Sequence, residues 1–200
     1  MKNRILLLPV LALLLAQSVP AQSLLLGRNI FPEGSFDILG DSDRVPSGWS
    51  FPDPNDKPWK AGFHAEAVKG ESGSKELRLT NPAFGYSGAQ AKLSLPPKIE
   101  SLRITFRLQA KNVTIGEPDS AGNGAGVYAR FYDAAAKAIP GSAGWVGGLT
   151  QSSDTEWQDK EKILHVPATA TTLEIQVMLR SASGEIRVDD VEVVPVAMRK

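Results

Sequence analysis

The chain has 200 residues, 42% of them hydrophobic, a length that suits one domain with an ordinary core better than two. Basic and acidic residues number 22 each, and this balance argues against nucleic acid as a partner. The absence of cysteine excludes disulfide scaffolds, thiolate metal sites and cysteine nucleophiles. The 18 glycines and 14 prolines indicate many turns that join short strands.

Residues 1–21 have the pattern of a secretory signal peptide. Lys2 and Arg4 precede an uncharged apolar run, and small residues follow up to Ala21. The run of about 12 residues is shorter than the roughly 20 that a membrane-spanning helix needs. We therefore predict cleavage near Ala21, a single domain over residues 22–200, and a secreted or periplasmic protein without membrane insertion.

The rest of the chain predicts strands. Residues 31–60 show no periodicity and are expected to form a long N-terminal loop. Further on, apolar and polar residues alternate with a period of two, most clearly over Ser101–Ala110. No window has a sustained helical period. The other segments expected to form strands are 63–68, 76–80, 89–95, 127–132, 162–166, 173–180 and 185–193.

These strands, separated by turns, predict an all-β fold in which two antiparallel sheets form a sandwich of eight or nine strands. The segments 29–37 and 46–49 near the start, and 182–191 near the end, resemble those of carbohydrate-binding modules appended to bacterial cellulases and xylanases. One departure is Glu33, where the family usually has asparagine. The resemblance implies the galactose-binding-like jelly roll of that family.

Two acidic residues suggest a metal ion. Asp37 follows the first strand and Asp189 begins the last, and the first and last strands of an antiparallel sandwich commonly meet. Two facing carboxylates favour a hard cation such as calcium. The resemblance implies a structural calcium held by Ser35, Asp37, Glu71, Asp189 and a carbonyl such as that of Ser74. Alternatively, Asp37 and Glu71 only accept hydrogen bonds from turn amides.

A sugar-binding surface needs flat aromatic side chains beside planar hydrogen-bonding groups. Tyr128, Arg130 and Tyr132 combine both on one face of a single strand. If the strand Ser101–Ala110 shares their sheet, Arg107 and Gln109 add further planar groups. These residues predict a shallow groove for a polysaccharide or oligosaccharide.

The tryptophans divide into two groups. Trp59 and Trp145 lie in expected loops and could form the walls of the groove. Tyr128 and Tyr132 could instead cover a sheet face without touching a ligand. By the resemblance, Trp49 and Trp157 belong to the core.

The sequence favours binding over catalysis. No pair of carboxylates with the spacing of a glycoside hydrolase stands out, and His64 and His165 are expected to be structural or surface residues. We predict a secreted, non-catalytic carbohydrate-binding protein. The main alternative is a structural or adhesive protein that binds a cell-surface protein partner. A second alternative is a polysaccharide lyase, with His64 beside Tyr128 or Tyr132, or a glycoside hydrolase accessory component.

Overall fold

The computed structural model describes residues 25–38, 45–51, 64–70, 73–117 and 122–197. The segment expected to be a signal peptide, together with Trp59 and Glu71, lies outside these residues. The elements in chain order are the 3-10 helix η1 (Pro32–Ser35) and the strands β1 (Trp49–Ser50), β2 (His64–Lys69), β3 (Lys75–Ser94), β4 (Ser101–Ile115), β5 (Gly124–Tyr132), β6 (Gly144–Leu149), β7 (Ser153–His165) and β8 (Thr172–Pro195).

The two longest strands, β3 and β8, run antiparallel along each other and bend together. Their register shifts between Asn81 and Gly85, opposite Ala182. The Asn81 side chain is buried at this bend, and its Nδ2 donates a hydrogen bond to the Ala182 carbonyl at 2.9 Å. Because both strands turn at the same place, each of them contributes to both layers of the molecule.

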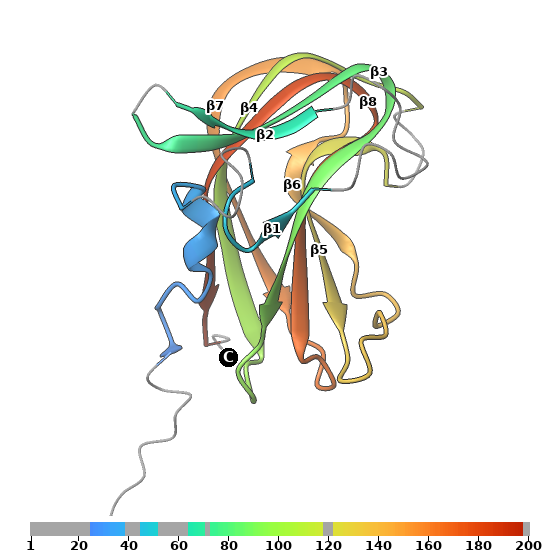
Figure 1. Cartoon of the computed structure of the whole chain (residues 1–200). Helices are drawn as coiled ribbons and strands as arrows, with labels where there is room; N and C mark the ends of the chain where they lie inside the picture. The colour runs from blue at the N-terminus through green and yellow to red at the C-terminus, as the bar shows by residue number, and fades with distance from the viewer. Residues whose placement is uncertain (1–24, 39–44, 52–63, 71–72, 118–121, 198–200) are drawn as a thin grey trace, which may run out of the picture.

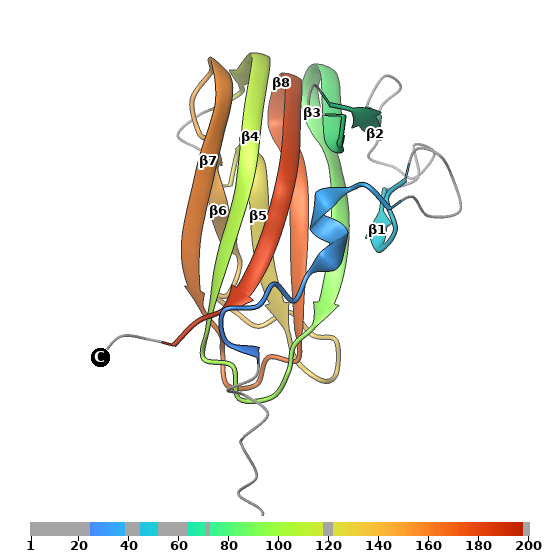
Figure 2. The ribbon, with the colours of Figure 1, turned by 90° about the vertical axis from the view of Figure 1, so that its left-hand side faces the viewer.

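The first layer, called the β4 sheet, contains β2, residues 75–81 of β3, residues 184–195 of β8, β4 and β7. The second, called the β5 sheet, contains β1, residues 86–94 of β3, residues 172–180 of β8, β5 and β6. Figure 2 shows β7, β4, β8 and β3 side by side, with β5 and β6 behind them. All strand pairs are antiparallel, which confirms the predicted jelly-roll sandwich (Figure 1).

The core lies between the two sheets and consists of the apolar residues of the alternating segments. Leu102, Ile104 and Leu108 of β4 are fully buried, as are Ile175 and other residues of β8. The polar residues between them face away from the core. The sequence periodicity therefore identified correctly which side of β4 and of β8 packs inward, whereas Ile163 of the expected strand 162–166 is 57% exposed.

The N-terminal segment lies against the last strand, as the sequence predicted. The Val193 amide donates to Asn29 Oδ1 at 3.0 Å, and the Ile30 amide donates to the Val193 carbonyl at 2.8 Å. Helix η1 packs so closely on β8 that a Cβ on Gly34 would overlap the Val191 carbonyl. Figure 2 shows η1 on the outer side of the β4 sheet.

Several elements differ from the prediction. The segments 76–80 and 89–95 belong to one bent strand, β3, and the segments 173–180 and 185–193 belong to β8. The sequence did not predict β6 or most of β7, and the expected loop over 31–60 contains η1 and β1. The described residues include no helix long and apolar enough to cross a membrane.

Candidate functional site

The outward side of the β5 sheet brings together the aromatic and polar side chains that a sugar-binding surface requires. We call this surface the tyrosine face. Its strands pair residue by residue, so the outward side chains form rows across β5, β8 and β3. The rows are Tyr132–Thr172–Ser94, Arg130–Glu174–Lys92, Tyr128–Gln176–Gln90, Gly126–Met178–Gly88 and Gly124–Arg180–Tyr86, and Trp145 of β6 lies beside Tyr128.

Glu174 is the centre of a hydrogen-bonded network on this face. Its carboxylate is 3% exposed and accepts hydrogen bonds from the Tyr132 hydroxyl at 3.0 Å and from Gln176 Nε2 at 2.7 Å. Lys92 Nζ lies 3.7 Å from its other oxygen and 5.2 Å from the centre of the Tyr132 ring. These contacts compensate the buried charge and hold the Tyr132 ring in one orientation.

Arg130 lies between two tyrosines of the same strand. A side-chain hydrogen bond with Tyr132 raises the pKa of Arg130 above its ordinary value, and Tyr128 adds to the effect. The guanidinium carbon is 6.0 Å from the centre of the Tyr128 ring. Arg130 is partly exposed, so its planar fork remains accessible beside two aromatic rings.

Gly124 makes room for the large side chain of Trp145. A Cβ on Gly124 would lie 3.0 Å from Cζ2 of Trp145, and a Cβ on Gly88 would lie 3.5 Å from the Tyr86 hydroxyl. Met178 lies in the row beside them and is only 2% exposed, although it alternates with core residues and faces outward. The Trp145 ring thus lies against Gly124, and the Tyr86 hydroxyl and the Met178 side chain lie beside Gly88. Burial raises the pKa of the Tyr86 phenol, which favours its protonated form.

Trp145 is held from two sides. Its ring meets the Tyr128 ring edge to face, with centroids 5.5 Å apart and an interplanar angle of 86°. Lys162 Nζ of β7 donates a hydrogen bond to the Trp145 carbonyl at 2.7 Å. The backbones of β5 and β6 approach each other so closely that a Cβ on Gly126 would overlap the Gly147 carbonyl. Trp145 therefore projects from a strand and not from the loop that the sequence predicted.

Arg107 and Gln109 do not lie beside the tyrosines. Both belong to β4, which pairs with β7 and with the second half of β8, so the assumption that β4 and β5 share a sheet was wrong. Alternation alone cannot tell which sheet a strand joins. Gln109 is also largely buried, because only 8% of its surface is exposed.

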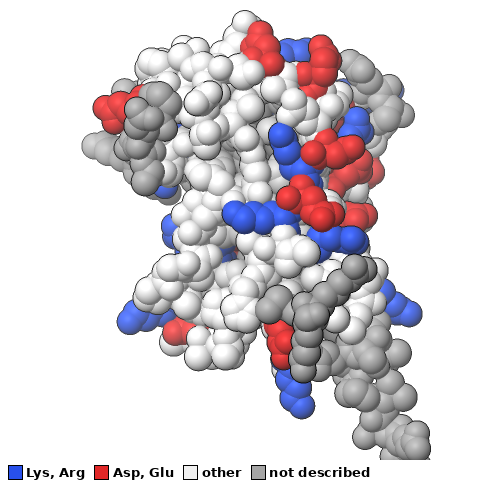
Figure 3. All heavy atoms as spheres, turned by 180° about the vertical axis from the view of Figure 1, so that it is seen from behind, with Lys and Arg blue, Asp and Glu red and all other residues white. Residues whose placement is uncertain are grey.

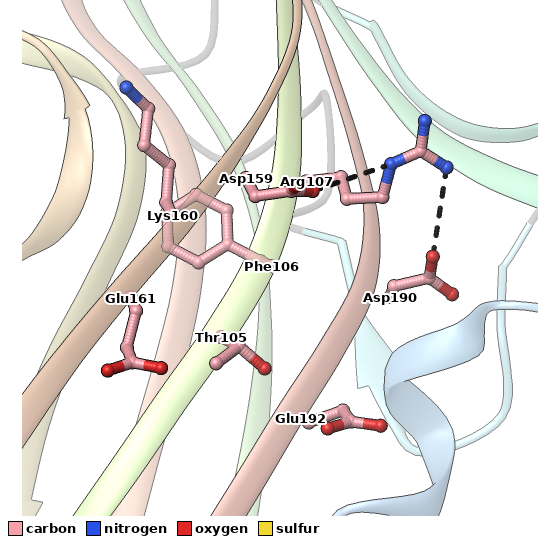
Figure 4. Close-up of a pocket in the computed structure, with 8 residues that line it drawn as sticks. All are labelled: Thr105, Phe106, Arg107, Asp159, Lys160, Glu161, Asp190 and Glu192. Atoms are coloured by element: carbon pink, nitrogen blue, oxygen red, sulfur yellow. Dashed lines mark ion pairs between the residues drawn. The ribbon is translucent and has the colours of Figure 1, made fainter.

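Arg107 lies in a separate hollow on the β4 sheet. Its guanidinium lies 3.9 Å from Asp159, 3.8 Å from Asp190 and 4.8 Å from the centre of the Trp157 ring (Figure 4). The prediction that Trp157 belongs to the core was wrong: it is partly exposed, and its ring lies under the Arg107 guanidinium. Trp49 is buried as predicted. The hollow has a volume of about 520 Å³ and is lined by Thr105, Phe106, Arg107, Asp159, Lys160, Glu161, Asp190 and Glu192.

Charges of both signs are mixed on the surface shown in Figure 3. Acidic and basic side chains lie next to one another, mostly on the right-hand half of this view. Among the described residues visible there, we see no extended area of a single sign. The prediction that the chain does not bind nucleic acid stays a prediction.

Some predicted calcium ligands belong to segments that adjoin. Asp37 Oδ1 accepts a hydrogen bond from the Lys75 amide at 2.8 Å, which joins the segment after η1 to the turn before β3. That turn includes Ser74, whose carbonyl accepts from Gly70 at 2.8 Å. Ser35 ends η1, which packs on β8 at Val191, two residues beyond Asp189. Among the residues described, no three acidic or histidine side chains form a ready metal cluster.

Two buried carboxylates in this region have incomplete compensation. Asp189 is 3% exposed, and burial raises its pKa to about 6, although the hydrogen bond from the Asp190 amide acts in the opposite direction. Glu76 is 4% exposed, and its Oε2 accepts no hydrogen bond although Arg187 lies 3.5 Å away. The Glu76 carboxylate is paired with Arg187, and Asp189 Oδ1 accepts a hydrogen bond from the Asp190 amide at 2.8 Å. Oxygen-rich donors beside buried, partly compensated carboxylates are compatible with calcium.

Comparison with known proteins supports the fold. No protein-family model and no curated protein matches the sequence. A solved family 4 carbohydrate-binding module aligns with 82% of this chain and 97% of its own, at 15% identity and a TM-score of 0.51. The chain has the jelly-roll fold of carbohydrate-binding modules. At this level of identity the likeness concerns the fold alone.

Two larger proteins contain a similar region. One is the enzymatically active domain of tailspike protein 4 from bacteriophage CBA120, with a TM-score of 0.57, 15% identity and coverage of 84% of this chain. The other is a Clostridium thermocellum endo-1,4-β-D-xylanase 10B fragment, CBM22-1 with GH10, complexed with xylohexaose, with a TM-score of 0.50, 13% identity and 86% coverage. This chain spans only 21% and 28% of their respective lengths.

Proposed function

We propose that the chain binds carbohydrate on the tyrosine face and does not transform it. The observation that carries the proposal is the set of aromatic side chains, Tyr86, Tyr128, Tyr132 and Trp145, on one outward sheet face with planar polar groups in the adjacent rows. Sugar rings have apolar C–H faces and a rim of hydroxyls, so aromatic surfaces and amide or guanidinium groups complement them.

Binding would use groups that are already in place. The edge-to-face contact with Tyr128 and the hydrogen bond from Lys162 orient Trp145. Glu174 orients the Tyr132 ring in the same way. Arg130 and Gln176 lie in neighbouring rows and can donate hydrogen bonds to hydroxyls. Side chains that are fixed before binding lose little conformational entropy on contact with a sugar chain.

The arrangement does not favour catalysis. Among the outward residues of the described strands of this face, Glu174 is the one carboxylate, and its Oε1 accepts two hydrogen bonds. A glycoside hydrolase of the usual kind needs a second carboxylate across a cleft. His64 lies on β2 of the β4 sheet, paired with Thr80, so it does not share a face with Tyr128 or Tyr132. The lyase hypothesis required that shared face.

An adhesive function finds less support. Docking to a protein usually uses a contiguous apolar patch. The exposed large apolar side chains of the described residues come from four different segments of the chain: Leu26, Ile38, Phe84 and Ile163.

A binding experiment tests the proposal. The protein should be retarded in native gels that contain a panel of polysaccharides, and Tyr128→Ala and Trp145→Ala should each weaken binding about fivefold, since stacking contributes on the order of 1 kcal/mol. Trp157→Ala is the matched control, because Trp157 is partly exposed on the other sheet. If no polysaccharide retards the protein, the proposal is wrong.

We also propose a structural calcium ion near the start of β3 and the end of β8. Asp37 and Asp189, with carbonyls of Ser35 and Ser74, would hold it, and Glu71 could add a ligand. The burial of Asp189, which raises its pKa to about 6, supports a nearby cation. Such an ion would neutralise these carboxylates and join the N-terminal segment to β8.

Calorimetry tests the calcium proposal. An ion at about 100 times its dissociation constant should stabilise the protein by about 2.7 kcal/mol, so a chelator should lower the Tm and added calcium should restore it. Asp189→Asn should abolish this response. Asp159→Asn serves as the control, because its carboxylate is 94% exposed in the separate hollow. A Tm that is unchanged by chelator would contradict the proposal.

A further inference from the structure

We propose that the tyrosine face selects an anionic polysaccharide, one whose sugar units carry uronate carboxylates, over a neutral one. This inference rests on the proposed function and adds the class of ligand. It arises from the charges on the face and from the way in which each of them is compensated.

The outward side chains of the tyrosine face carry an excess of positive charge. Lys92, Arg130 and Arg180 are its cations, and Glu174 is the acid among its described residues. The whole chain, by contrast, has a formal net charge of 0. The face is therefore more positive than the protein that carries it.

The single acid is already neutralised. The Glu174 carboxylate is buried, and Tyr132, Gln176 and Lys92 occupy its oxygens. Lys92 and Glu174 thus compensate each other, which leaves the two arginines as the charges available to a ligand. The Lys92 ammonium, 3.7 Å from Oε2, offsets the repulsion that the Glu174 carboxylate would exert on an anion.

The two arginines make no ion pair with a described acid, unlike Arg78, Arg107 and Arg187 of the β4 sheet. Arg187 pairs with Glu185 at 2.9 Å, and Arg78 pairs with Glu66. A structural role for an arginine normally involves such partners. Arg180 is exposed, and a Cβ on its neighbour Gly122 would lie 3.1 Å from Nη1.

The surroundings of Arg130 suit a carboxylate on a stacked sugar. Its fork lies between Tyr128 and Tyr132 on one strand, and a guanidinium binds a carboxylate through two parallel hydrogen bonds. A sugar ring on either tyrosine would place its substituents next to that fork.

Arg180 is a second cation on the tyrosine face, in a row distant from that of Arg130. Arg130 of β5 lies opposite Glu174 of β8, and Arg180 lies six residues after Glu174 on β8. At about 3.3 Å per residue the two rows are roughly 20 Å apart. One arginine could therefore contact one unit of an extended chain while the other contacts a different unit, which favours a polymer with repeated carboxylates.

The test compares a polyuronate with the same polymer after chemical reduction of its carboxyl groups, by titration calorimetry on the full chain. We expect the polyuronate to bind at least about tenfold more tightly at low salt, because charge-assisted hydrogen bonds are about twice as strong as neutral ones. The preference should shrink as salt rises, since screening weakens contacts between exposed charges.

Variants locate the preference. Arg130→Gln and Arg180→Gln should each reduce the ratio of the two affinities severalfold, and Arg130→Lys should restore it only in part, because lysine lacks the fork. Lys111→Gln removes an exposed charge from the β4 sheet and should leave the ratio unchanged.

The outcomes separate this inference from the proposed function. Binding of both polymers with equal affinity would overturn the anionic preference and leave carbohydrate binding intact. Binding of neither polymer, nor of any in the panel, would overturn both. A preference that survives in both arginine variants would also contradict the inference.

Discussion

The Tyr132 hydroxyl donates a hydrogen bond to the buried carboxylate of Glu174 at 3.0 Å. The two residues come from neighbouring strands, β5 and β8, whose pairing places Tyr132 opposite Thr172 and Arg130 opposite Glu174. The contact therefore runs diagonally between rows and links the aromatic part of the face to its charged part. It explains how a carboxylate can be 3% exposed on the outward side of a sheet.

Tyr132→Phe keeps the ring and removes this donor. We expect the free energy of unfolding to fall by about 1.5 kcal/mol, because a buried charged acceptor loses one of its partners. Urea denaturation measures the change. Tyr128→Phe is the control: its hydroxyl interacts with the partly exposed Arg130, so the loss should stay below about 0.5 kcal/mol. Equal effects in the two variants would show that Glu174 does not depend on Tyr132.

Gly126→Ala tests the close approach of β5 and β6. The added Cβ would overlap the Gly147 carbonyl, so β6 must move away and carry Trp145 with it. We expect a destabilisation of about 1 to 3 kcal/mol, a shift in tryptophan fluorescence and weaker carbohydrate binding. Gly144→Ala is the matched control on β6, since a Cβ there meets nothing within 4 Å. The interpretation fails if both variants behave like the native protein.

Asp189 predicts how stability depends on pH in the absence of metal. Burial raises its folded-state pKa to about 6, above the unfolded value of 3.8. The folded protein then binds more protons than the unfolded chain between these values, so the free energy of unfolding falls as pH rises from about 4 to 6. The penalty, about 3 kcal/mol at most, is fully present above that window.

Denaturation in the presence of a chelator, at pH 4 and at pH 8, measures this dependence. Asp189→Asn cannot ionise, so it should be more stable than the native protein at pH 8 and lose that advantage at pH 4. A constant difference between the two proteins at both pH values would mean that Asp189 is not the group responsible.

The sequence predicted the fold well where one face of a strand is buried, and poorly where it is not. Alternation over Ser101–Ala110 marks β4 because its apolar side chains reach the core. Edge strand β7 is exposed on both sides along much of its length, so it shows almost no alternation. In β6 three of six residues are glycine, which removes the side chains that would carry a pattern.

The site was predicted in part for a related reason. Tyr128, Arg130 and Tyr132 share one strand, so their common side follows from spacing alone. Which residues lie beside them depends on strand pairing, which spacing does not determine. Glu174 and Arg180 alternate with core residues but were therefore not predicted as site residues, and Arg107 was expected there only if β4 joined the sheet of β5, which it does not.

Lys162 provides a test of how the site is positioned from outside it. Its Nζ donates to the Trp145 carbonyl at 2.7 Å, across from β7 to β6. Lys162→Met keeps the aliphatic chain and removes the donor, so Trp145 should become less well held. We expect carbohydrate affinity to fall about threefold to tenfold, in line with one hydrogen bond of about 1 kcal/mol. The Tm should change little, because the contact lies at the surface.

The neighbouring lysine gives the control for this last experiment. Lys160 lies on the same strand, but its Nζ bonds Gln158 Oε1 at 2.7 Å and makes no hydrogen bond to β6 among the described residues. Lys160→Met removes the same charge and should leave the affinity unchanged. If both variants weaken binding equally, the loss reflects the charge of β7 and not the position of Trp145. If neither does, the orientation of Trp145 comes from Tyr128 and the β5–β6 backbone alone.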